Sequence, residues 1–367
     1  MKRETQIELI REILRSIDRG SSSLGETFTR NDPRIYTSPE RDARERDVLF
    51  RRQPLVVGVA SELRRPGDYL TESLSPVPIL VVRQASGELR AFVNVCRHRG
   101  SRLVEGSGTA PRGFTCPYHA WSYEPDGRLA DIPDEFGFPG LDRSRQGLIE
   151  IPVAERHGLV WVLPEPGGSF SVDEILRGLG EELDSYGIAG HRVFETRVVR
   201  RRMNWKLASD TFWEAYHLKV LHRRTIAKLF LRNIALFHPF GRSHRFVGVR
   251  ESIVELRGRP ETEWDLLPHA TILMNLFPNT VLIMQSDHLE LFRIFPAPDR
   301  VNECAVAVSL LAPGAESGEE HQRRWKQTMD LLMGVLDEDF TNGEAIQRNF
   351  ETGFPDHVVY GRYENAL

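Results

Sequence analysis

Two short cysteine–histidine motifs constrain what this chain can fold into more than any other feature of its sequence. Cys96 and His98 lie two positions apart, and Cys116 and His119 lie three positions apart. Both motifs sit among residues that favour turns, so two short loops can hold a small metal centre between them. Two cysteines and two histidines suit either a tetrahedral zinc ion or a two-iron, two-sulfide cluster with both histidines on one iron.

The stretch that carries these four residues, CRHRGSRL…CPYHAWSY, resembles the Rieske motif C-x-H…C-x-x-H. The resemblance includes the Arg-Gly pair after the first histidine and the aromatic residue just past the second. It implies a [2Fe-2S] cluster in which Cys96 and Cys116 bind one iron and His98 and His119 bind the other. The family usually has glycine where this chain has Ala120, and an alanine is strained there if the backbone φ angle is positive.

Composition places the chain among ordinary globular proteins. Hydrophobic residues make up 40% and charged residues 27% of its 367 residues, which is enough for a sizeable core. The formal net charge of −4 is small for this length and gives no indication of a nucleic-acid surface. The length predicts two domains or one large one.

Cysteine use and hydropathy bear on the location of the protein. Cys304 is the one cysteine outside the two motifs, and its alternating apolar surroundings predict a buried free thiol. A chain without a disulfide framework fits a reducing cytoplasm. No apolar run reaches the ~18 residues of a transmembrane helix, and the N-terminal segment has helical periodicity rather than the apolar core of a signal peptide. We therefore expect a cytoplasmic protein with no membrane partner.

The sequence predicts three successive parts: an N-terminal helical segment (1–49) that packs on the last part, a small antiparallel β domain (50–165) with both ligand pairs at loop tips, and an α+β domain (166–367). Within the last part we expect a helix over 172–187, a central antiparallel sheet and a long C-terminal helix over 318–350. The strands of that sheet are predicted at 192–201, 245–257, 271–276, 280–285, 288–295 and 303–312.

A second group of candidate metal ligands lies in the segment 204–222, which predicts a helix over much of its length. On such a helix Glu214 and His217 are one turn apart and share a face. His217 and His222 are separated by about 140° on an ideal helix, so both reach one metal only if the helix distorts or ends between them. We therefore place His222 at or just past the C-terminus of this helix.

The predicted C-terminal helix offers a third ligand. Its apolar stripe, formed by Trp325, Met329, Leu332 and Leu336, continues to Asp339, whereas Asp337 and Glu338 rotate away from it. A carboxylate on a buried stripe is costly unless it forms an ion pair or binds a cation. A salt bridge to an arginine is one interpretation. The other is a site of two histidines and one carboxylate, which leaves open positions on an Fe(II) ion.

Together these segments resemble the catalytic α subunit of Rieske non-haem iron oxygenases, the aromatic-ring-hydroxylating oxygenases. Besides the cluster loops, the similarity rests on the NWK…E-x-Y-H-x(4)-H segment and on the pattern Glu-Asp…Glu…Gln-Arg that begins at Glu338. It implies that residues 166–367 form a catalytic domain with a mononuclear Fe(II) bound by His217, His222 and Asp339. It also implies that Glu214 is an acidic bridge to His119 in the cluster of a neighbouring subunit.

Two residues depart from the family pattern. The bridge is most often aspartate, and here it is Glu214. The family commonly has Glu-Asn where this chain has Ser209-Asp210, so Asp210 is expected to add a negative charge beside the substrate. Both positions are treated as candidate catalytic residues.

The resemblance implies a terminal oxygenase that uses O₂ to hydroxylate, dihydroxylate or oxidatively demethylate a small organic substrate, with aromatic compounds and aromatic hydrocarbon catabolism as the first expectation. The chain has no G-x-G-x-x-G after a strand, so electrons are expected from a separate NAD(P)H-dependent reductase, with or without a ferredoxin. The family pattern implies a homotrimer, or a multiple of it, in which the cluster of one subunit abuts the iron of the next. Four arginines near the cluster loops are either a docking site for an acidic redox partner or a merely solvated surface: Arg97, Arg99, Arg102 and Arg112.

Three other functions stay open from the sequence. The first is a quaternary ammonium monooxygenase of the same family, which Glu214 and Asp210 would favour. The second is a Rieske electron-transfer protein without oxygenase activity, and the third a zinc-stabilised binding protein. The substrate is not defined, although an apolar pocket near the iron has candidate lining residues, most of which we expect to be plain core: Phe212, Trp213, Phe230, Phe237, Met274, Phe277 and Phe292.

Overall fold

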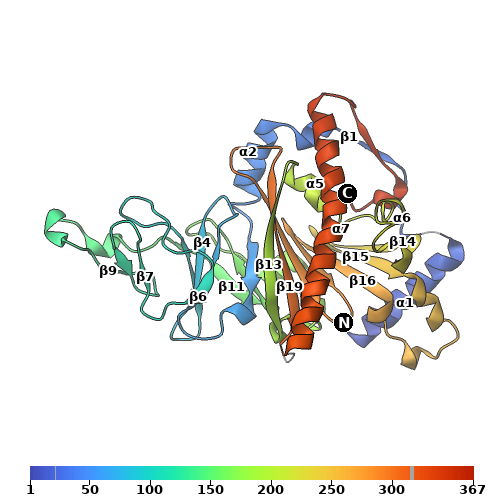
Figure 1. Ribbon diagram of the computed structural model, residues 1–367, viewed down its shortest axis with the longest axis horizontal. Coiled ribbons are helices and arrows are strands. Elements are labelled where there is room, and N and C mark those ends of the chain that lie inside the picture. The colour runs from blue at the N-terminus through green and yellow to red at the C-terminus, as the bar shows by residue number, and fades with distance from the viewer. Residues whose placement is uncertain (21, 315–317) are drawn as a thin grey trace. The chain divides into compact units, whose positions relative to one another are not determined.

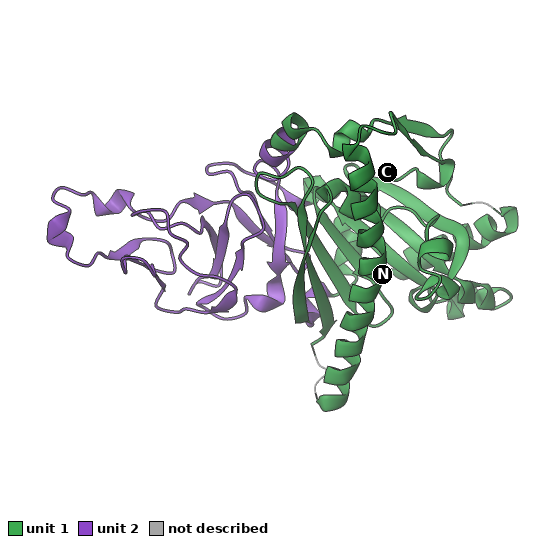
Figure 2. Ribbon diagram, turned by 45° about the horizontal axis from the view of Figure 1, so that its top comes forward, with its two compact units in different colours: residues 1–43, 173–187, 193–367 green, residues 44–172, 188–192 purple. Residues whose placement is uncertain are grey.

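The computed structural model describes residues 1–20, 22–314 and 318–367, which divide into two compact units (Figure 2). One unit consists of residues 44–172 and 188–192, and the other of residues 1–43, 173–187 and 193–367. No helix in the described part of the chain is both long enough and apolar enough to cross a membrane.

The smaller unit is built from short antiparallel strands in three sheets, ordered β10-β5-β4-β3-β6, β11-β12-β2 and β7-β8-β9. Its strands are β2 (Leu55–Val59), β3 (Asp68–Glu72), β4 (Ile79–Arg83), β5 (Leu89–Val93), β6 (Ser107–Thr109), β7 (Phe114–Thr115), β8 (Ser122–Tyr123), β9 (Leu129–Asp131), β10 (Glu150–Ile151), β11 (Val153–Arg156) and β12 (Leu159–Val162). One of its core clusters contains Cys96 and Cys116 together with Leu80, Phe92 and Tyr123. The two cysteines are therefore fixed by the same packing that stabilises the sheets.

The larger unit is organised on a seven-stranded sheet of order β13-β19-β18-β17-β16-β15-β14. Its strands are β13 (His191–Arg201), β14 (Phe230–Phe240), β15 (Ser243–Arg250), β16 (Ala270–Leu276), β17 (Thr280–Met284), β18 (Leu289–Pro296) and β19 (Cys304–Pro313). Strands β14 to β19 pair antiparallel with their neighbours. A two-stranded ribbon of β1 (Thr29–Asn31) and β20 (Val358–Tyr360) joins the two ends of the chain.

The helices of the larger unit confirm the amphipathic patterns at both ends of the chain. Helix α1 (Arg3–Arg19) buries Leu9, Ile10 and Ile13 and ends at Gly20, which has a φ of 65°. Helix α7 (Glu319–Glu351) lies against the sheet (Figure 1), and its Trp325 and Met329 pack on Leu310 of β19. The remaining helices are α2 (Pro39–Val48), α3 (Val172–Leu176), α4 (Leu179–Asp184), α5 (Trp205–Asp210) and α6 (Leu218–Leu221). The expected α+β class, with a central antiparallel sheet and a long C-terminal helix, is confirmed.

Three predicted elements differ in the structure. The helix over 172–187 breaks into α3 and α4, because Arg177 and Gly178 adopt φ angles of 44° and 93°. The strand predicted to reach residue 257 ends at Arg250, where a 3₁₀ turn begins. Strand β14 was not predicted, and its alternation is interrupted by Asn233, at a φ of 54°, within an irregular register.

The prediction of a helix over much of 204–222 is wrong for the middle of that segment. The structure has α5 and the short α6, with a turn between them at residues 211–217. Asn204 caps α5 by accepting a hydrogen bond from the backbone N–H of Lys206 at 3.0 Å. This interruption reorients the segment that carries both histidines.

Candidate metal centres

Each cysteine–histidine motif forms a closed loop. After β5, the backbone N–H of Cys96 donates to the carbonyl of Ser101 at 2.7 Å. Between β7 and β8, the N–H of Cys116 donates to the carbonyl of Trp121 at 2.8 Å. Ala120, inside the second loop, has a φ of 58°, so the condition under which alanine is strained at this position is met. The loops thus place a thiol at the base and an imidazole near the tip.

The four side chains of these loops gather at one end of the smaller unit's core. The cysteines are buried, whereas the histidines are partly exposed. The rings of His98 and His119 lie 4.6 Å apart between centroids, and Trp121 stacks on His98 at 4.9 Å with an interplanar angle of 7°. Two thiols inside and two imidazoles outside are the donor arrangement that a Rieske cluster requires.

The protonation preferences of these side chains fit metal binding. The Nδ1 atoms of His98 and His119 are buried and accept or donate no hydrogen bond within the described residues. Burial, together with the neighbouring His119 and Arg99, lowers the pKa of His98 and favours the neutral ring. Burial raises the pKa of the Cys116 thiol, but hydrogen bonds from backbone N–H groups, led by that of Tyr118, outweigh this and leave the pKa below its usual value. Neutral imidazole and thiolate are the forms that bind metal.

The second predicted group of ligands is brought together in the larger unit. Single ligand atoms of His217, His222 and Asp339 all lie within 4.8 Å of one another. The Nε2 atoms of His217 and His222 lie 3.5 Å and 3.2 Å from Asp339 Oδ1. His222 caps the C-terminus of α6, as predicted, and Asp339 lies on the buried face of α7. Asp339 Oδ1 is buried yet makes no well-directed hydrogen bond, which suits a carboxylate that shares a cation with its neighbours.

Two further carboxylates contact the Nδ1 atoms of these histidines. Glu214 Oε1 contacts Nδ1 of His217, and Glu338 Oε2 lies 2.7 Å from Nδ1 of His222. Because Nδ1 is engaged on each ring, Nε2 is the nitrogen left to bind a metal. Glu338 also accepts a hydrogen bond from Thr225 Oγ1 at 2.7 Å. Glu338 was predicted to point away from the apolar stripe and had no predicted role, although its position directly before Asp339 could have suggested one.

His222 has an unusual electrostatic environment. Burial lowers its pKa, but the adjacent Asp339 and Glu338 carboxylates outweigh burial and raise it overall. In the metal-free protein these carboxylates therefore favour the imidazolium, and a metal ion has to displace its proton.

Asp210 lies near the metal group, on the same side as Tyr36 and Tyr360. Its carboxylate accepts a hydrogen bond from Tyr36 Oη at 2.6 Å, and Tyr36 Oη lies 2.6 Å from Tyr360 Oη. These residues line a second cavity that also reaches Glu214 and His217. Burial raises the pKa of Asp210 to about 6. Asp210 does not line the apolar cavity, and its expected role beside the substrate stays a prediction.

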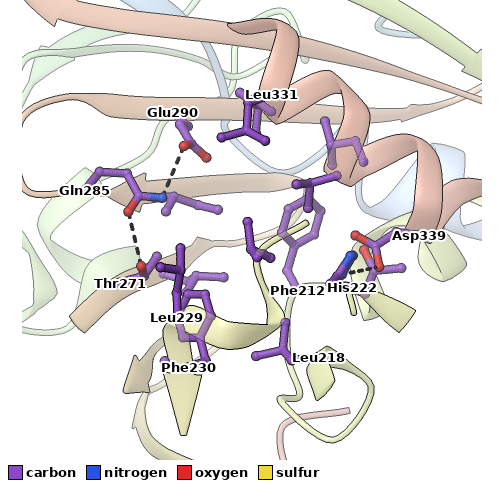
Figure 3. A pocket seen from close by; sticks show the side chains of 18 of the residues that line it. Phe212, Leu218, His222, Leu229, Phe230, Thr271, Gln285, Glu290, Leu331 and Asp339 are labelled. Atoms are coloured by element: carbon purple, nitrogen blue, oxygen red, sulfur yellow. Dashed lines mark hydrogen bonds and ion pairs between the residues drawn. The ribbon is translucent and has the colours of Figure 1, made fainter. Parts of the chain in front are cut away.

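An apolar cavity of about 290 Å³ opens beside His217, His222 and Asp339 (Figure 3). Among the side chains that the sequence offered for such a pocket, Phe212, Phe230 and Phe292 line it, whereas Trp213, Phe237, Met274 and Phe277 do not. Polar lining residues that were not predicted include Arg250, Thr271, Gln285, His288, Glu290 and Thr328. They come from strands, a turn and helix α7, and no local motif connects all of them.

Comparison with known proteins divides the chain in the same two parts. Residues 53–140 match the family model of the Rieske [2Fe-2S] domain, and residues 188–367 match that of the ring hydroxylating alpha subunit (catalytic domain). The chain is 34% identical to chlorobenzene dioxygenase subunit alpha of Cupriavidus sp. (strain PS12) over 193 residues, which are 51% of this chain and 43% of the relative. It is 32% identical to the carnitine monooxygenase oxygenase subunit of Acinetobacter baumannii over 190 residues, 51% of each chain.

The matched regions span about half the length of these curated relatives. The similarity of fold covers more of the chain than the similarity of sequence does. The crystal structure of the quaternary ammonium Rieske monooxygenase CntA in complex with L-carnitine superposes with a TM-score of 0.78, covering 94% of this chain and 93% of that one at 22% identity. At this identity the similarity concerns the fold alone.

Proposed function

Because the chain belongs to the Rieske oxygenase family, with a Rieske [2Fe-2S] domain followed by a ring-hydroxylating alpha-subunit catalytic domain, we propose that it is the terminal oxygenase of an O₂-dependent enzyme system. Its substrate would be a small organic molecule that is hydroxylated, dihydroxylated or oxidatively demethylated. The observation that carries this proposal is the convergence of His217, His222 and Asp339 at the wall of an apolar cavity.

The residues of the catalytic domain have distinct roles in this proposal. An iron held by His217, His222 and Asp339 would supply oxygen activation, with single electrons from a cluster held by Cys96, His98, Cys116 and His119. Glu214 and Glu338 fix the histidine rings so that both Nε2 atoms face Asp339. Phe212 and Phe292 hold the apolar part of a substrate beside these ligands and exclude water from it.

Electron delivery is proposed to cross between subunits of a homotrimer, or of a multiple of it. Glu214 would connect His217 to His119 of a neighbouring copy. Its carboxylate already contacts His217 Nδ1, and a carboxylate has enough lone pairs to accept a further hydrogen bond. A separate NAD(P)H-dependent reductase, with or without a ferredoxin, would supply the electrons. The exposed Arg97 and Arg112 near the cluster loops are suited to an acidic partner.

Loss of one iron ligand tests the proposed function. We expect His217→Ala to lose the mononuclear iron and all O₂-dependent oxidation, while the visible absorbance and the EPR signal of the reduced cluster persist. Iron content, EPR and product formation with a surrogate reductase would be measured on the same preparation. Continued substrate oxidation by the variant, or a colourless wild-type protein that contains zinc alone, would overturn the proposal.

Oxidation of a quaternary ammonium compound is a second candidate function. It is favoured by the matches to carnitine and glycine betaine monooxygenases and by glutamate at the bridge position. O₂ uptake coupled to product formation with carnitine or glycine betaine, measured against a monocyclic arene, would distinguish the two substrate classes.

A further inference from the structure

One end of the apolar cavity is polar. We call this group the polar end; it consists of Arg250, Thr271, Gln285, His288 and Glu290. Its residues come from the end of β15, the start of β16, and the turn and strand that follow β17. Figure 3 shows Thr271, Gln285 and Glu290 across the cavity from His222 and Asp339. The cavity therefore has two polar regions, the candidate metal ligands and the polar end, with apolar walls between them.

Arg250 is the unusual member of the polar end. Its Nη2 donates to Gln285 Oε1 at 2.8 Å and to Thr271 Oγ1 at 3.2 Å, and its Nη1 donates to the carbonyl of Pro268 at 3.3 Å. All three acceptors are uncharged. Its Nε is buried and has no hydrogen-bond partner among the described residues. Burial lowers the pKa of Arg250 by more than the nearby Asp287 and Glu290 carboxylates raise it, so these carboxylates compensate its charge only in part.

The other charges at this end are paired with one another. His288 lies between Asp287, at 2.6 Å from Nδ1, and Glu290, at 3.2 Å from Nε2. Burial lowers the pKa of His288, but the two carboxylates raise it to about 9, so the ring is an imidazolium at neutral pH. Asp287 also contacts Arg324. Within the described chain, no carboxylate lies within ion-pair distance of Arg250, so Arg250 is the cation of the polar end without a direct ion pair.

From this arrangement we propose that the cavity binds an elongated organic acid, with the carboxylate on Arg250 and the apolar body extending to the candidate metal ligands. This inference rests on the proposed function and names the substrate class of the same site. The walls between the two regions fit an apolar body because they are built from Phe212, Leu273, Phe292, Leu332 and Val335. A guanidinium binds a carboxylate with charge-assisted hydrogen bonds, and Nη1 of Arg250 keeps one N–H beyond the one that it donates to the Pro268 carbonyl.

The spacing of the residues of helix α7 that line the cavity indicates the length of the ligand. Its first half lies at the polar end, because Arg324 contacts Asp287 and Trp325 packs on the ring of His288 at 5.5 Å. Thr328 and Asp339 both line the cavity and are about three turns apart, which is about 16 Å along the helix axis. A short acid such as benzoate is too small to reach both regions. A cationic headgroup at the polar end would be repelled by Arg250 and by the His288 imidazolium.

Matched ligands of one length test this inference without turnover. Binding of 6-phenylhexanoate, its primary amide and the corresponding trimethylammonium compound would be measured by calorimetry on the iron-loaded protein under argon, with benzoate as the short acid. We expect 6-phenylhexanoate to bind about 10- to 100-fold more tightly than its amide, the range of a charge-assisted hydrogen-bonded pair. We expect Arg250→Gln to abolish this preference and Arg250→Lys to retain part of it.

Arg257→Gln is the control variant, because Arg257 is an arginine of the same unit that pairs with Asp18 and does not line the cavity. It should leave the preference unchanged. Equal binding of acid and amide by the wild type, or an acid preference that survives in Arg250→Gln, would overturn the inference while leaving the proposed oxygenase function intact. If Arg250→Gln does not fold, the inference is tested by comparing the preference for the acid over its amide in the wild type and in Arg250→Lys. Arg250-dependent binding without oxidation of any ligand would instead contradict the proposed function.

Discussion

At the scale of single residues, the candidate iron site depends on two carboxylates that do not belong to its ligand set. Glu214 and Glu338 each engage the Nδ1 atom of one histidine, which leaves Nε2 to face Asp339. The role of Glu214 follows from a family resemblance. Glu338 could not be assigned from the sequence, because its partner His222 is far away in the chain and is reached only when α7 packs beside α6.

Replacing Glu338 should therefore weaken metal binding without removing a ligand. We expect Glu338→Ala to lower Fe(II) or Co(II) affinity by about 10- to 100-fold, the usual effect of losing the group that orients a histidine ligand. Asp337→Ala is the matched control, since the adjacent carboxylate is exposed and pairs with Arg201 instead. Metal titration with the cluster absorbance as an internal standard would measure this. Equal affinity in the two variants would refute the role of Glu338.

Asp210 should make stability depend on pH. Its pKa rises from 3.8 to about 6 on folding because the carboxyl group is buried, so the folded protein holds this proton more tightly than the unfolded chain does. The contribution of Asp210 to the free energy of unfolding therefore falls as pH rises from about 4 to 6, by up to about 3 kcal/mol. Asp210→Asn keeps an acceptor for Tyr36 and should raise the melting temperature of the metal-free protein at pH 8, with little gain near pH 4. A variant that is destabilised at pH 8 would show that the charged carboxylate is needed.

At the scale of elements, apolar periodicity predicts the long helices and most strands. Elements that depend on single side-chain contacts were not predicted. The long stripes of α1 and α7 and most strands of the large sheet follow from the pattern of apolar residues. The turn at 211–217 does not, because it depends on Glu214 accepting hydrogen bonds from the backbone N–H groups of Tyr216 and His217. Strand β14 was missed because Asn233 interrupts its alternation.

Two neighbouring positions on α7 test how this helix is anchored. Met329 is fully buried against Leu310, whereas Leu331 is 55% exposed. We expect Met329→Ala to lower the free energy of unfolding of the larger unit by about 2–5 kcal/mol, because the core loses apolar contacts and gains a cavity. Leu331→Ala should change it by less than about 1 kcal/mol. Thermal unfolding of both variants would be compared, and similar losses would contradict the packing of α7 on the sheet.

At the scale of the whole molecule, the candidate ligands could be named from local motifs, whereas the shape of the substrate cavity could not. The loops of the cluster and the His-x₄-His spacing are short-range patterns. Arg250 ends β15, Gln285 follows β17 and Glu290 lies in β18, so only the pairing of the strands brings them together. This explains why the chemistry was predicted more closely than the substrate.

Electron transfer between subunits can be tested by complementation. Cys116→Ser should remove the cluster and His217→Ala the catalytic iron, so either variant alone should be inactive. Differently tagged copies, co-expressed and purified as mixed oligomers, should regain activity, because the cluster of one copy can serve the iron of its neighbour. Mixed oligomers that contain both chains and stay inactive would contradict transfer between subunits.

The central claim is that His217, His222 and Asp339 bind a single reactive iron. The most direct measurement is EPR of the nitric oxide adduct of Fe(II)-loaded protein with its cluster oxidised and silent. We predict a high-spin iron–nitrosyl signal in the wild type that disappears in His217→Ala, His222→Ala and Asp339→Ala, while the cluster absorbance of all four proteins is unchanged. A nitrosyl signal of full intensity in any of the three variants would contradict the claim.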